Sequence, residues 1–441
     1  MNRRLFLIII PFMIFSSAIG GAEYDLQSIL KLAESRNKEI KLAAADLKLA
    51  SARKMEAWSQ ALPKVNLDLN YNRNFLQNVF FFTITDSTGR RRTTRFQSTF
   101  NNELQVNAVL SQTIFAFGKV GKAISAAGDF DHFTELQYSA QWQDVITRVK
   151  KAFYQTLLLQ KVWQVAKASE ESARDNYQNT KTKYESGVVS EFDLLQAEVR
   201  WQNAIPETMK ARKNYQLALN NLKQMVELPL DKPLVLKGDL EKFPPLPDSL
   251  KIATVFHQRP DYNALLWERK LRQKAVSVEF ANNFPTLTAD LRYTYSARSD
   301  VFRLENTNRN LVLGVNLHIP VFSGRFTQAQ VQKARVELKK VNTRVSMLND
   351  NVRIEINNIY LRLKEARSRV TAARKSVNTA RRAFEIAESR TENGLSTQLE
   401  LKDSRLFLDR AQLNYYTAIF DYLSAFFDWE KATGQVTLAA F

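Results

Sequence analysis

The sequence contains no cysteine and little glycine or proline, with 12 and 11 of these two residues in a chain of 441. The absence of cysteine excludes disulfides, thiolate chemistry and a lipid-modified amino-terminal cysteine. Glycine and proline at about half their average usage favour long uninterrupted elements over many short ones joined by turns. We therefore expect long helices, and any membrane attachment must come from another feature of the chain.

Long apolar runs are missing from the chain after its amino-terminal stretch. No later segment approaches the roughly 20 apolar residues that a membrane helix needs. At the amino terminus, two arginines precede an apolar stretch from Leu5 to Phe15, and small residues follow up to Ala22. This layout is typical of a secretory signal peptide, which we assign to residues 1–22. The mature chain is expected to have no transmembrane helix, so membrane attachment would depend on strands.

Catalytic and metal-binding patterns are missing as well. The three histidines, His132, His257 and His318, are scattered along the chain. No nucleophile motif or metal-ligand spacing accompanies them. We predict a protein without enzyme activity, cofactor or bound metal.

The formal net charge of +18 raises the question of a nucleic-acid partner, because neutralising phosphates is the main source of such affinity. Secretion argues against that partner, and the basic residues are spread along the chain among 45 acidic ones. One dense cluster, Arg90, Arg91, Arg92 and Arg95, is expected in a loop. A solvated loop is the simpler interpretation of this cluster, and contact with lipid-headgroup phosphates is the alternative.

The mature chain contains an internal repeat. Three matches keep their order at offsets of 222, 206 and 207 positions, and they pair Pro63 with Pro285, Gly118 with Gly324, and Gly187 with Gly394. We assign the first repeat to residues 23–238 and the second to residues 239–441. The larger first offset indicates an insertion in the first copy around residues 79–95, and insertions of this kind belong in loops.

Each half contains two segments in which apolar and polar residues alternate, as in a strand with one apolar face. These segments are residues 64–75, 102–115, 286–296 and 310–320, all bounds approximate. A soluble half-buried sheet gives the same period, so the pattern alone does not require a membrane. If the strands do span one, four cannot close a barrel, because even small barrels use about eight strands. Three chains would supply twelve.

Long helices follow the strands in each half. Residues 119–186 contain no proline, and residues 325–393 contain neither proline nor glycine, so each helix could extend roughly 100 Å at 1.5 Å per residue. From Val352 to Ala387, apolar residues keep a four-three spacing, which is typical of a coiled-coil seam.

Returning helices are expected at about residues 191–227 and 397–431, and they should pack along the long ones as antiparallel hairpins with tips near residues 187 and 394. Pro206 should kink or split the first returning helix. Pro260 is expected to begin a new helix, because proline suits a first turn.

This order of elements resembles the TolC family of outer-membrane efflux proteins over almost the entire mature chain. The resemblance rests on a helix-start signature, in which Lys38 replaces the usual proline of the first copy, and on the junctions between helices and strands. The matching segments are Asn37-Lys38-Glu39-Ile40, Arg259-Pro260-Asp261-Tyr262, Leu62-Pro63, Phe284-Pro285 and Phe322-Ser323-Gly324-Arg325.

The resemblance implies a mainly α-helical protomer with a membrane β-barrel. Its long antiparallel coiled-coil hairpins would form a periplasmic α-barrel, and its four strands would contribute to a shared 12-stranded barrel in a homotrimer. The implied function is an outer-membrane channel in a tripartite export system. The implied partners are a periplasmic adaptor (membrane fusion) protein, an inner-membrane pump of the RND or ABC type and outer-membrane lipid. Drug, metal and protein export, including type I secretion, use similar channels.

The resemblance also suggests roles for tip residues. Gly187 and Val188, with Gly394 and Leu395, match the turns that dock the adaptor.

Other matches concern the pore. Glu400 and Asp403 match residues that line the closed entrance, where three copies would form two carboxylate rings that favour cations. An exposed pair favoured by the helix dipole is the simpler alternative. Tyr184 and Asp193 match gating contacts that hold relatives shut, although Ser396 stands where some relatives have a basic residue in that contact.

A secreted structural coiled coil or adhesin without a pore is the competing class. It would also have long helices. It does not explain the four alternating strands or their duplication.

Overall fold

A computed structural model describes residues 23–76, 78–248, 252–393 and 395–439 of the chain, and the predicted signal peptide lies outside these residues. The chain is mainly helical and divides into two compact units, each of which draws on both predicted halves of the sequence. Within the described residues, the helical unit comprises residues 23–41, 141–258 and 354–439, and the sheet unit comprises Leu42–Ala140 and Arg259–Arg353.

The described helices are α1 (Leu26–Arg36), α2 (Lys38–Ser59), α3 (Lys119–Glu185), α4 (Glu191–Met225), α5 (Ile252–Gln258), α6 (Pro260–Ala281), α7 (Phe326–Glu392) and α8 (Gln398–Thr433). Both α3 and α7 contain 67 residues, as the scarcity of glycine and proline predicted. None of the described helices combines the length and the apolar character needed to cross a membrane.

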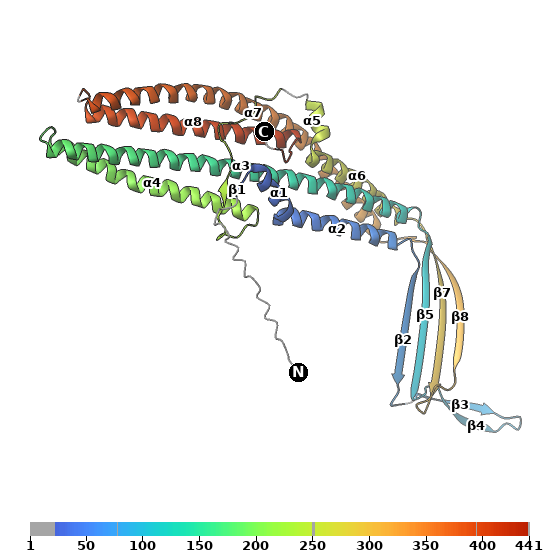
Figure 1. Ribbon diagram of the computed structural model, residues 1–441. Coiled ribbons are helices and arrows are strands. Elements are labelled where there is room, and N and C mark those ends of the chain that lie inside the picture. Colours follow the sequence, from blue (N-terminus) through green and yellow to red (C-terminus); the bar gives the residue numbers. More distant parts are fainter. Residues whose placement is uncertain (1–22, 77, 249–251, 394, 440–441) are drawn as a thin grey trace, which may run out of the picture. The chain divides into compact units, whose positions relative to one another are not determined.

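The sheet unit contains four strands in the order β2-β5-β7-β8, with every neighbouring pair antiparallel. Their bounds are Lys64–Arg73 for β2, Asn102–Phe115 for β5, Thr286–Ser299 for β7 and Asn308–His318 for β8. Strand β5 of the first half pairs with β7 of the second, so the two halves share one sheet (Figure 1). In the described chain, β2 and β8 each pair on one side only, which leaves two open edges.

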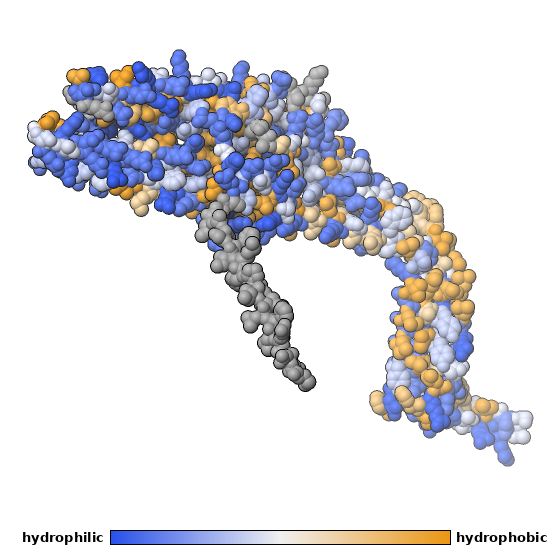
Figure 2. Space-filling view, viewed as in Figure 1, coloured by the Kyte–Doolittle hydropathy of each residue, from blue (hydrophilic) through white to orange (hydrophobic). Residues whose placement is uncertain are grey.

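The strand register brings the apolar positions of all four strands onto one face. Leu67 is paired with Ala108, Ala108 with Tyr293, and Tyr293 with Leu311. Many of these side chains are exposed, and Leu67 and Leu313 are both 71% accessible. Figure 2 shows the apolar side chains spread along the strands. A sheet that leaves such a face uncovered requires an apolar environment or a partner.

The opposite face of the sheet is polar. Thr294 donates a hydrogen bond to Asn107 across β7 and β5 at 2.9 Å, and the Asn316 amide donates to Asp290 at 2.7 Å. Gly314 lies against Asp290, where a Cβ atom would come within 3.0 Å of the carboxylate. The Asp290 side chain lies over the backbone of Gly314, so glycine in the middle of β8 leaves room for this carboxylate.

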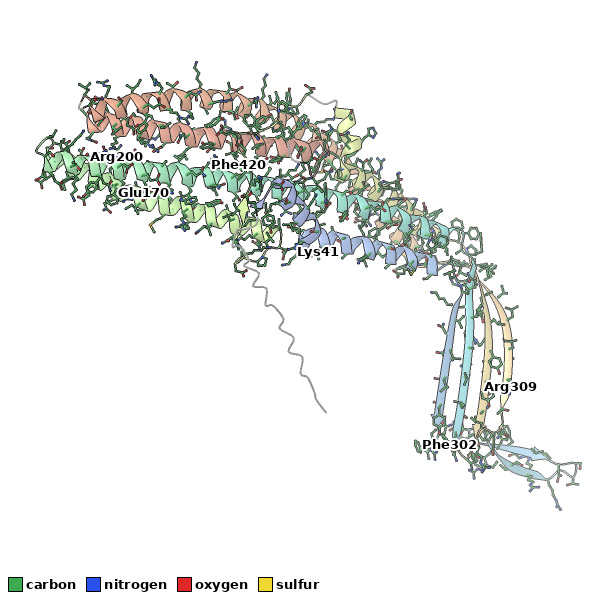
Figure 3. The ribbon with its side chains drawn as sticks, viewed as in Figure 1. Lys41, Glu170, Arg200, Phe302, Arg309 and Phe420 are labelled. Carbon is green, nitrogen blue, oxygen red and sulfur yellow. The ribbon has the colours of Figure 1, made fainter. Side chains whose placement is uncertain are left out.

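Aromatic rings lie at both ends of the sheet. At the end next to the helices of the same unit, the Phe117 ring lies 4.9 Å from that of Phe115 and 5.1 Å from that of Phe284. At the other end, Tyr71 meets Phe302 edge to face at 6.0 Å, and Figure 3 labels Phe302 there. Aromatic girdles flanking an apolar band are typical of strands that cross a membrane.

The insertion of the first half is a β-hairpin, and the prediction of a loop was wrong for most of it. Strand β3 (Val79–Thr85) pairs with β4 (Arg91–Gln97), so Arg91, Arg92 and Arg95 lie in a strand and Arg90 in the turn before it. The physical reason is composition, because both segments are rich in aromatic and β-branched residues, which favour strands.

The helical unit is built from two helical hairpins. The seam predicted for α7 is buried at Ile356, Ile359, Leu363, Ala366, Val370, Val377 and Phe384. Of the two outcomes expected at Pro206, a kink or a split, the split was wrong, since α4 is assigned without interruption through this residue. The Thr208 hydroxyl donates to the Ala166 carbonyl of α3 at 3.2 Å, which holds the helix just beyond the proline. Pro260 lies in the first turn of α6, as predicted.

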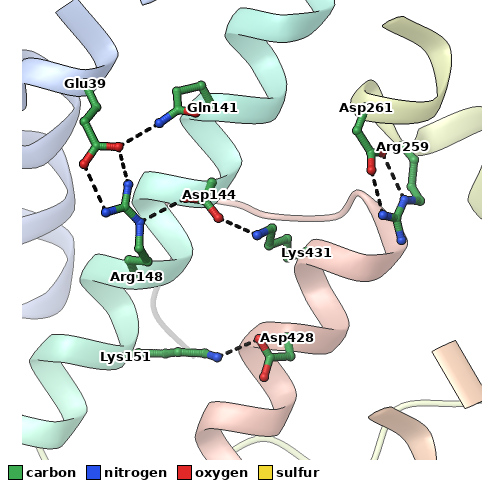
Figure 4. A network of polar contacts seen from close by, with 9 residues as sticks. All are labelled: Glu39, Gln141, Asp144, Arg148, Lys151, Arg259, Asp261, Asp428 and Lys431. Atoms are coloured by element: carbon green, nitrogen blue, oxygen red, sulfur yellow. Dashed lines mark hydrogen bonds and ion pairs between the residues drawn. The ribbon is translucent and has the colours of Figure 1, made fainter. Parts of the chain in front are cut away.

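Ion pairs connect three helices in the helical unit. Figure 4 shows Arg148 of α3 bonded to Glu39 of α2 and to Asp144 of its own helix, and Asp144 also accepts a hydrogen bond from Lys431 of α8. Nearby, the buried Lys150 ammonium lies 2.7 Å from Glu430 of α8. Separately from these ion pairs, two short strands, β1 (Glu23–Tyr24) and β6 (Val235–Leu236), pair in parallel.

Candidate functional site at the hairpin tips

The first tip is a tight helix end built on Gly187. This residue has a φ of +75°, a left-handed conformation that glycine adopts without steric cost. Its N–H donates to the Tyr184 carbonyl at 2.9 Å, and the Val188 N–H donates to the Lys183 carbonyl at the same distance. This pair of bonds is a Schellman motif, which ends α3 and turns the chain back. It leaves Val188 pointing outward with 71% of its surface exposed.

A capping box begins the returning helix α4. The Asp193 N–H donates to the Ser190 hydroxyl at 3.2 Å, and the Ser190 N–H donates to the Asp193 carboxylate at 3.3 Å. The Ser190 hydroxyl also donates to this carboxylate at 2.6 Å. Asp193, which we predicted as a gating contact, is thus engaged in stabilising its own helix start.

The second tip follows the same plan. The Leu395 N–H donates to the Arg390 carbonyl at 2.8 Å, and Leu395 is 69% exposed. Gly394, the predicted tip residue, lies outside the described residues. The Glu400 N–H donates to the Thr397 hydroxyl at 3.2 Å, and the Ser396 hydroxyl donates to the Glu400 carboxylate.

The two tips are equivalent under the internal repeat. Ser190 and Thr397, which cap the starts of the returning helices, are 207 positions apart in the sequence. Asp193 and Glu400, the third residues of these helices, are separated by the same 207 positions. A predicted gating residue and a predicted pore-lining residue therefore occupy the same structural place. Both carboxylates lie at a helix amino terminus, where the helix dipole favours negative charge.

The remaining predicted residues are exposed near the tips. Asp403 lies one turn beyond Glu400 on the surface of α8, and Tyr184 in the last turn of α3 is 39% exposed. In the described residues, the structure records no hydrogen bond between the Tyr184 side chain and Asp193.

A cluster of charged residues that the sequence did not indicate lies between the two hairpins. Arg405 Nε of α8 lies 2.9 Å from Asp409 Oδ1, and the side chains of both residues are only 15% exposed. Burial raises the pKa of Asp409 above its ordinary value, although Arg405, a hydrogen bond from Ser169 of α3 and Arg200 of α4 oppose the shift. Figure 3 labels Arg200 on its helix.

Arg200 connects this cluster to a predicted pore residue. Burial lowers the pKa of Arg200, while the charges of Asp403 and Asp409 act in the opposite direction. The Arg405–Asp409 spacing of four residues on one helix could have suggested an ion pair from the sequence. Nothing local pointed to Arg200 or Ser169, because they lie on the other hairpin.

Grooves run between the hairpins near the tips. One of about 300 Å³ is polar and includes Asn176, Lys183, Glu388 and Arg405. Another of about 660 Å³ is more apolar and is lined by residues of α3, α4 and α8, including Phe192, Leu195, Val199, Leu399 and Lys402. An apolar groove between helices, with polar residues at its border, suits an amphipathic helix from a partner.

Comparison with known protein families gives a match over both repeats. The model of the outer membrane efflux protein family covers residues 29–226 and 252–435. These ranges include the tip residues and the strands of the sheet unit.

Individual relatives are distant in sequence. The chain is 21% identical over 327 residues to the outer membrane protein TolC of Vibrio cholerae, covering 72% of this chain and 69% of that protein. It is 24% identical over 241 residues to the alkaline protease secretion protein AprF of Pseudomonas aeruginosa, covering 52% and 49% of the two chains. Among solved structures, the outer membrane channel CmeC of Campylobacter jejuni has the same fold, with a TM-score of 0.76, 19% identity and coverage of 93% of this chain and 85% of CmeC.

Proposed function

This chain belongs to the outer membrane efflux protein family, and from that premise we propose its function. We propose that three copies of the chain form the outer-membrane channel of a tripartite export system. The family match over both repeats is the observation that carries the proposal. It makes the chain an outer-membrane, TolC-like protein with a periplasmic extension, and the family is one of efflux proteins rather than of enzymes. The trimer, the shared barrel and the partners are the proposed part.

The sheet supports a barrel shared among chains. Its four strands alternate in direction, so β8 of one chain would run antiparallel to β2 of the next. Every copy adds four strands and has the same two open edges. The unpaired backbone groups of an open edge are not tolerated in lipid, so the copies must close into a ring. Three copies would give twelve strands, with the apolar face toward lipid and the polar face toward the channel.

The tips support docking of a periplasmic adaptor, which would couple the channel to an inner-membrane pump. Val188 and Leu395 are exposed at the hairpin tips, and the apolar groove with Phe192 and Leu399 lies close behind them. An adaptor helix with apolar residues at i, i+3 and i+4 would fit such a groove.

The channel entrance can be tested at Glu400 and Asp403. We expect Glu400→Ala with Asp403→Ala to raise single-channel conductance roughly twofold and to weaken cation preference, because two rings of carboxylates would be lost. Planar-bilayer recordings measure both quantities. The matched control is Glu198→Ala with Glu207→Ala on the other hairpin. Unchanged conductance and selectivity would remove Glu400 and Asp403 from the pore lining.

The assembly can be tested by mass. Light scattering of the detergent-purified protein, corrected for bound detergent, should give about 150 kDa, three times the chain mass of 50.8 kDa. A detergent-free soluble monomer or dimer would contradict the channel and favour a structural coiled coil instead.

A further inference from the structure

The β3–β4 hairpin is a separate feature of the sheet unit, and the described residues of the second half contain no counterpart to it. It extends from the end of the sheet that is remote from the helices of the same unit (Figure 1). The segments that lead into and out of the hairpin are joined where the Asn74 N–H donates to the Asn101 carbonyl at 2.8 Å. The Asn101 N–H in turn donates to Asp300, at the end of β7, at 3.1 Å. These two bonds therefore hold the flanking segments at this end of the sheet.

The hairpin is apolar near its base. Phe80 is paired with Phe96, and the Phe82 and Phe96 rings meet edge to face at 6.4 Å. Nonetheless Phe81 is 69% exposed, and Phe80, Phe82, Ile84 and Phe96 are each more than half exposed. An isolated two-stranded hairpin is marginally stable in water, and a hydrophobic surface of this kind marks a site of interaction.

The hairpin is cationic near its tip. Arg91 is paired with Thr85 and Arg92 with Ile84, Arg90 lies in the turn, and Arg95 is nearer the base. All four arginines are exposed, and in the described part of the chain no carboxylate lies within ion-pair distance of them. The single acidic residue of the hairpin, Asp86, is occupied within the turn.

Asp86 does not neutralise the arginine side chains. Its carboxylate accepts hydrogen bonds from the N–H groups of Thr88 and Arg90, both at 2.9 Å, and from the Thr88 hydroxyl at 2.6 Å. The Thr88 hydroxyl and these backbone bonds hold the pKa of Asp86 below its ordinary value. The carboxylate shapes the turn and leaves four guanidinium groups directed at the surroundings.

We propose that this hairpin binds the phosphate-bearing headgroups of lipids at the membrane surface remote from the helices. The proposal rests on the proposed function, because only a sheet that spans the membrane brings the hairpin to that surface. Aromatic residues near the base would lie at the boundary of the acyl chains, and the arginines would lie further out, at the level of the phosphates. Guanidinium groups suit this partner because their planar donors match phosphate oxygens in pairs.

Charge argues against a second copy of the chain as the occupant. Three hairpins that met above the channel would bring their exposed arginines together without any acidic side chain to offset them. Like charges at such a contact oppose association. Anionic lipid headgroups have the opposite sign and attract each basic residue near the surface.

The test compares lipid binding by two triple variants of the full-length protein in detergent. The probe is lipid A, a phosphorylated glycolipid, compared with the same lipid after removal of its phosphates. In Arg91→Gln/Arg92→Gln/Arg95→Gln, we expect affinity for phosphorylated lipid A to fall roughly tenfold or more. The control, Arg335→Gln/Arg362→Gln/Arg374→Gln, removes the same charge from exposed positions of α7 and should bind like the wild type. Binding by the wild type should weaken with added salt.

Equal affinities in the two triple variants, or no preference for the phosphorylated lipid, would overturn the proposal. Phe82→Ser with Phe96→Ser tests the competing occupant. Loss of the assembled trimer with unchanged lipid binding would identify a second copy and would also overturn the proposal. Conductance recordings distinguish failure of the proposed function from failure of the lipid site. A wild-type protein that forms no channels contradicts the proposed function. Normal channels together with unchanged lipid A affinity in the Arg91, Arg92 and Arg95 triple variant contradict only the lipid site.

Discussion

Asp144 shows how a single side chain stabilises the junction of helices in the helical unit. It accepts hydrogen bonds from Lys431 of α8 and from Arg148, which itself bonds Glu39 at the start of α2. Burial acts to raise the pKa of Asp144, but the contacts with Lys431 and Arg148 outweigh it and hold the pKa below the ordinary value of 3.8. The folded state therefore favours the ionised carboxylate.

The pH dependence of this contribution has a definite sign. A carboxylate with a lowered folded pKa stabilises the protein above its unfolded pKa, and this stabilisation is lost as the pH falls through the folded pKa. We expect Asp144→Asn to lower the unfolding free energy by about 1 kcal/mol near neutral pH, since the site is partly exposed. Thermal unfolding from pH 7 to pH 3 should show the difference from wild type shrinking with acid. Asp46→Asn, at an exposed position of α2, is the control. A difference that stayed constant down to pH 3 would contradict the assignment.

At the scale of the element, each hairpin tip combines a fixed helix end with a capped helix start. The Ser190–Asp193 capping box satisfies N–H groups that the first turn of α4 would otherwise leave unpaired. The tips can therefore present Val188 and Leu395 in a defined position without a large apolar core beneath them.

Removing the cap should loosen the first turn. We expect Ser190→Ala to cost about 1 kcal/mol locally and to speed amide hydrogen exchange roughly fivefold at residues 190–194. Hydrogen exchange measured by mass spectrometry resolves this segment. Ser186→Ala provides the control, because the Ser186 hydroxyl donates only to the Thr182 carbonyl one turn back, at 2.9 Å. Equal exchange in both variants would show that the cap contributes nothing to tip order.

At the scale of the whole molecule, the two faces of β8 differ in polarity, and this difference allows the proposed lipid-facing side of the sheet to be tested. Val312 and Leu313 are neighbours whose side chains lie on opposite faces, since Leu313 is paired with Leu291 on the apolar face and Val312 with Arg292 on the polar face. Leu313 is 71% exposed, although it lies in the middle of a strand. A sheet that crosses a membrane should tolerate charge on only one of these faces.

We expect Leu313→Arg to prevent accumulation of the assembled channel in the outer membrane, because an arginine facing lipid near the midplane costs roughly 2–4 kcal/mol. Val312→Arg should assemble, since its side chain would face the polar interior. Quantifying the trimer in outer-membrane fractions compares the two variants, which differ by one position. Normal assembly of Leu313→Arg would mean that this face does not contact lipid.

Regular and local features were predictable from the sequence. The four-three spacing predicted the seam at Ile356 and Leu363, and Pro260 indicated the start of α6. Gly187 marked a turn because its left-handed backbone favours glycine. These features depend on the chemistry of neighbouring residues, so a single chain displays them as periods and breaks.

Only the tertiary structure decided the contacts between distant segments. It continued α4 through Pro206 with support from α3, and it brought Arg200 to the Arg405–Asp409 pair. Pairing across strands or hairpins depends on which remote residues come to lie opposite, and short-range spacing does not contain that information. The sequence by itself therefore determined the long helices, the four strands of the sheet, their order and the family resemblance. The register of the sheet and the charged cluster between the hairpins were decided by packing in three dimensions.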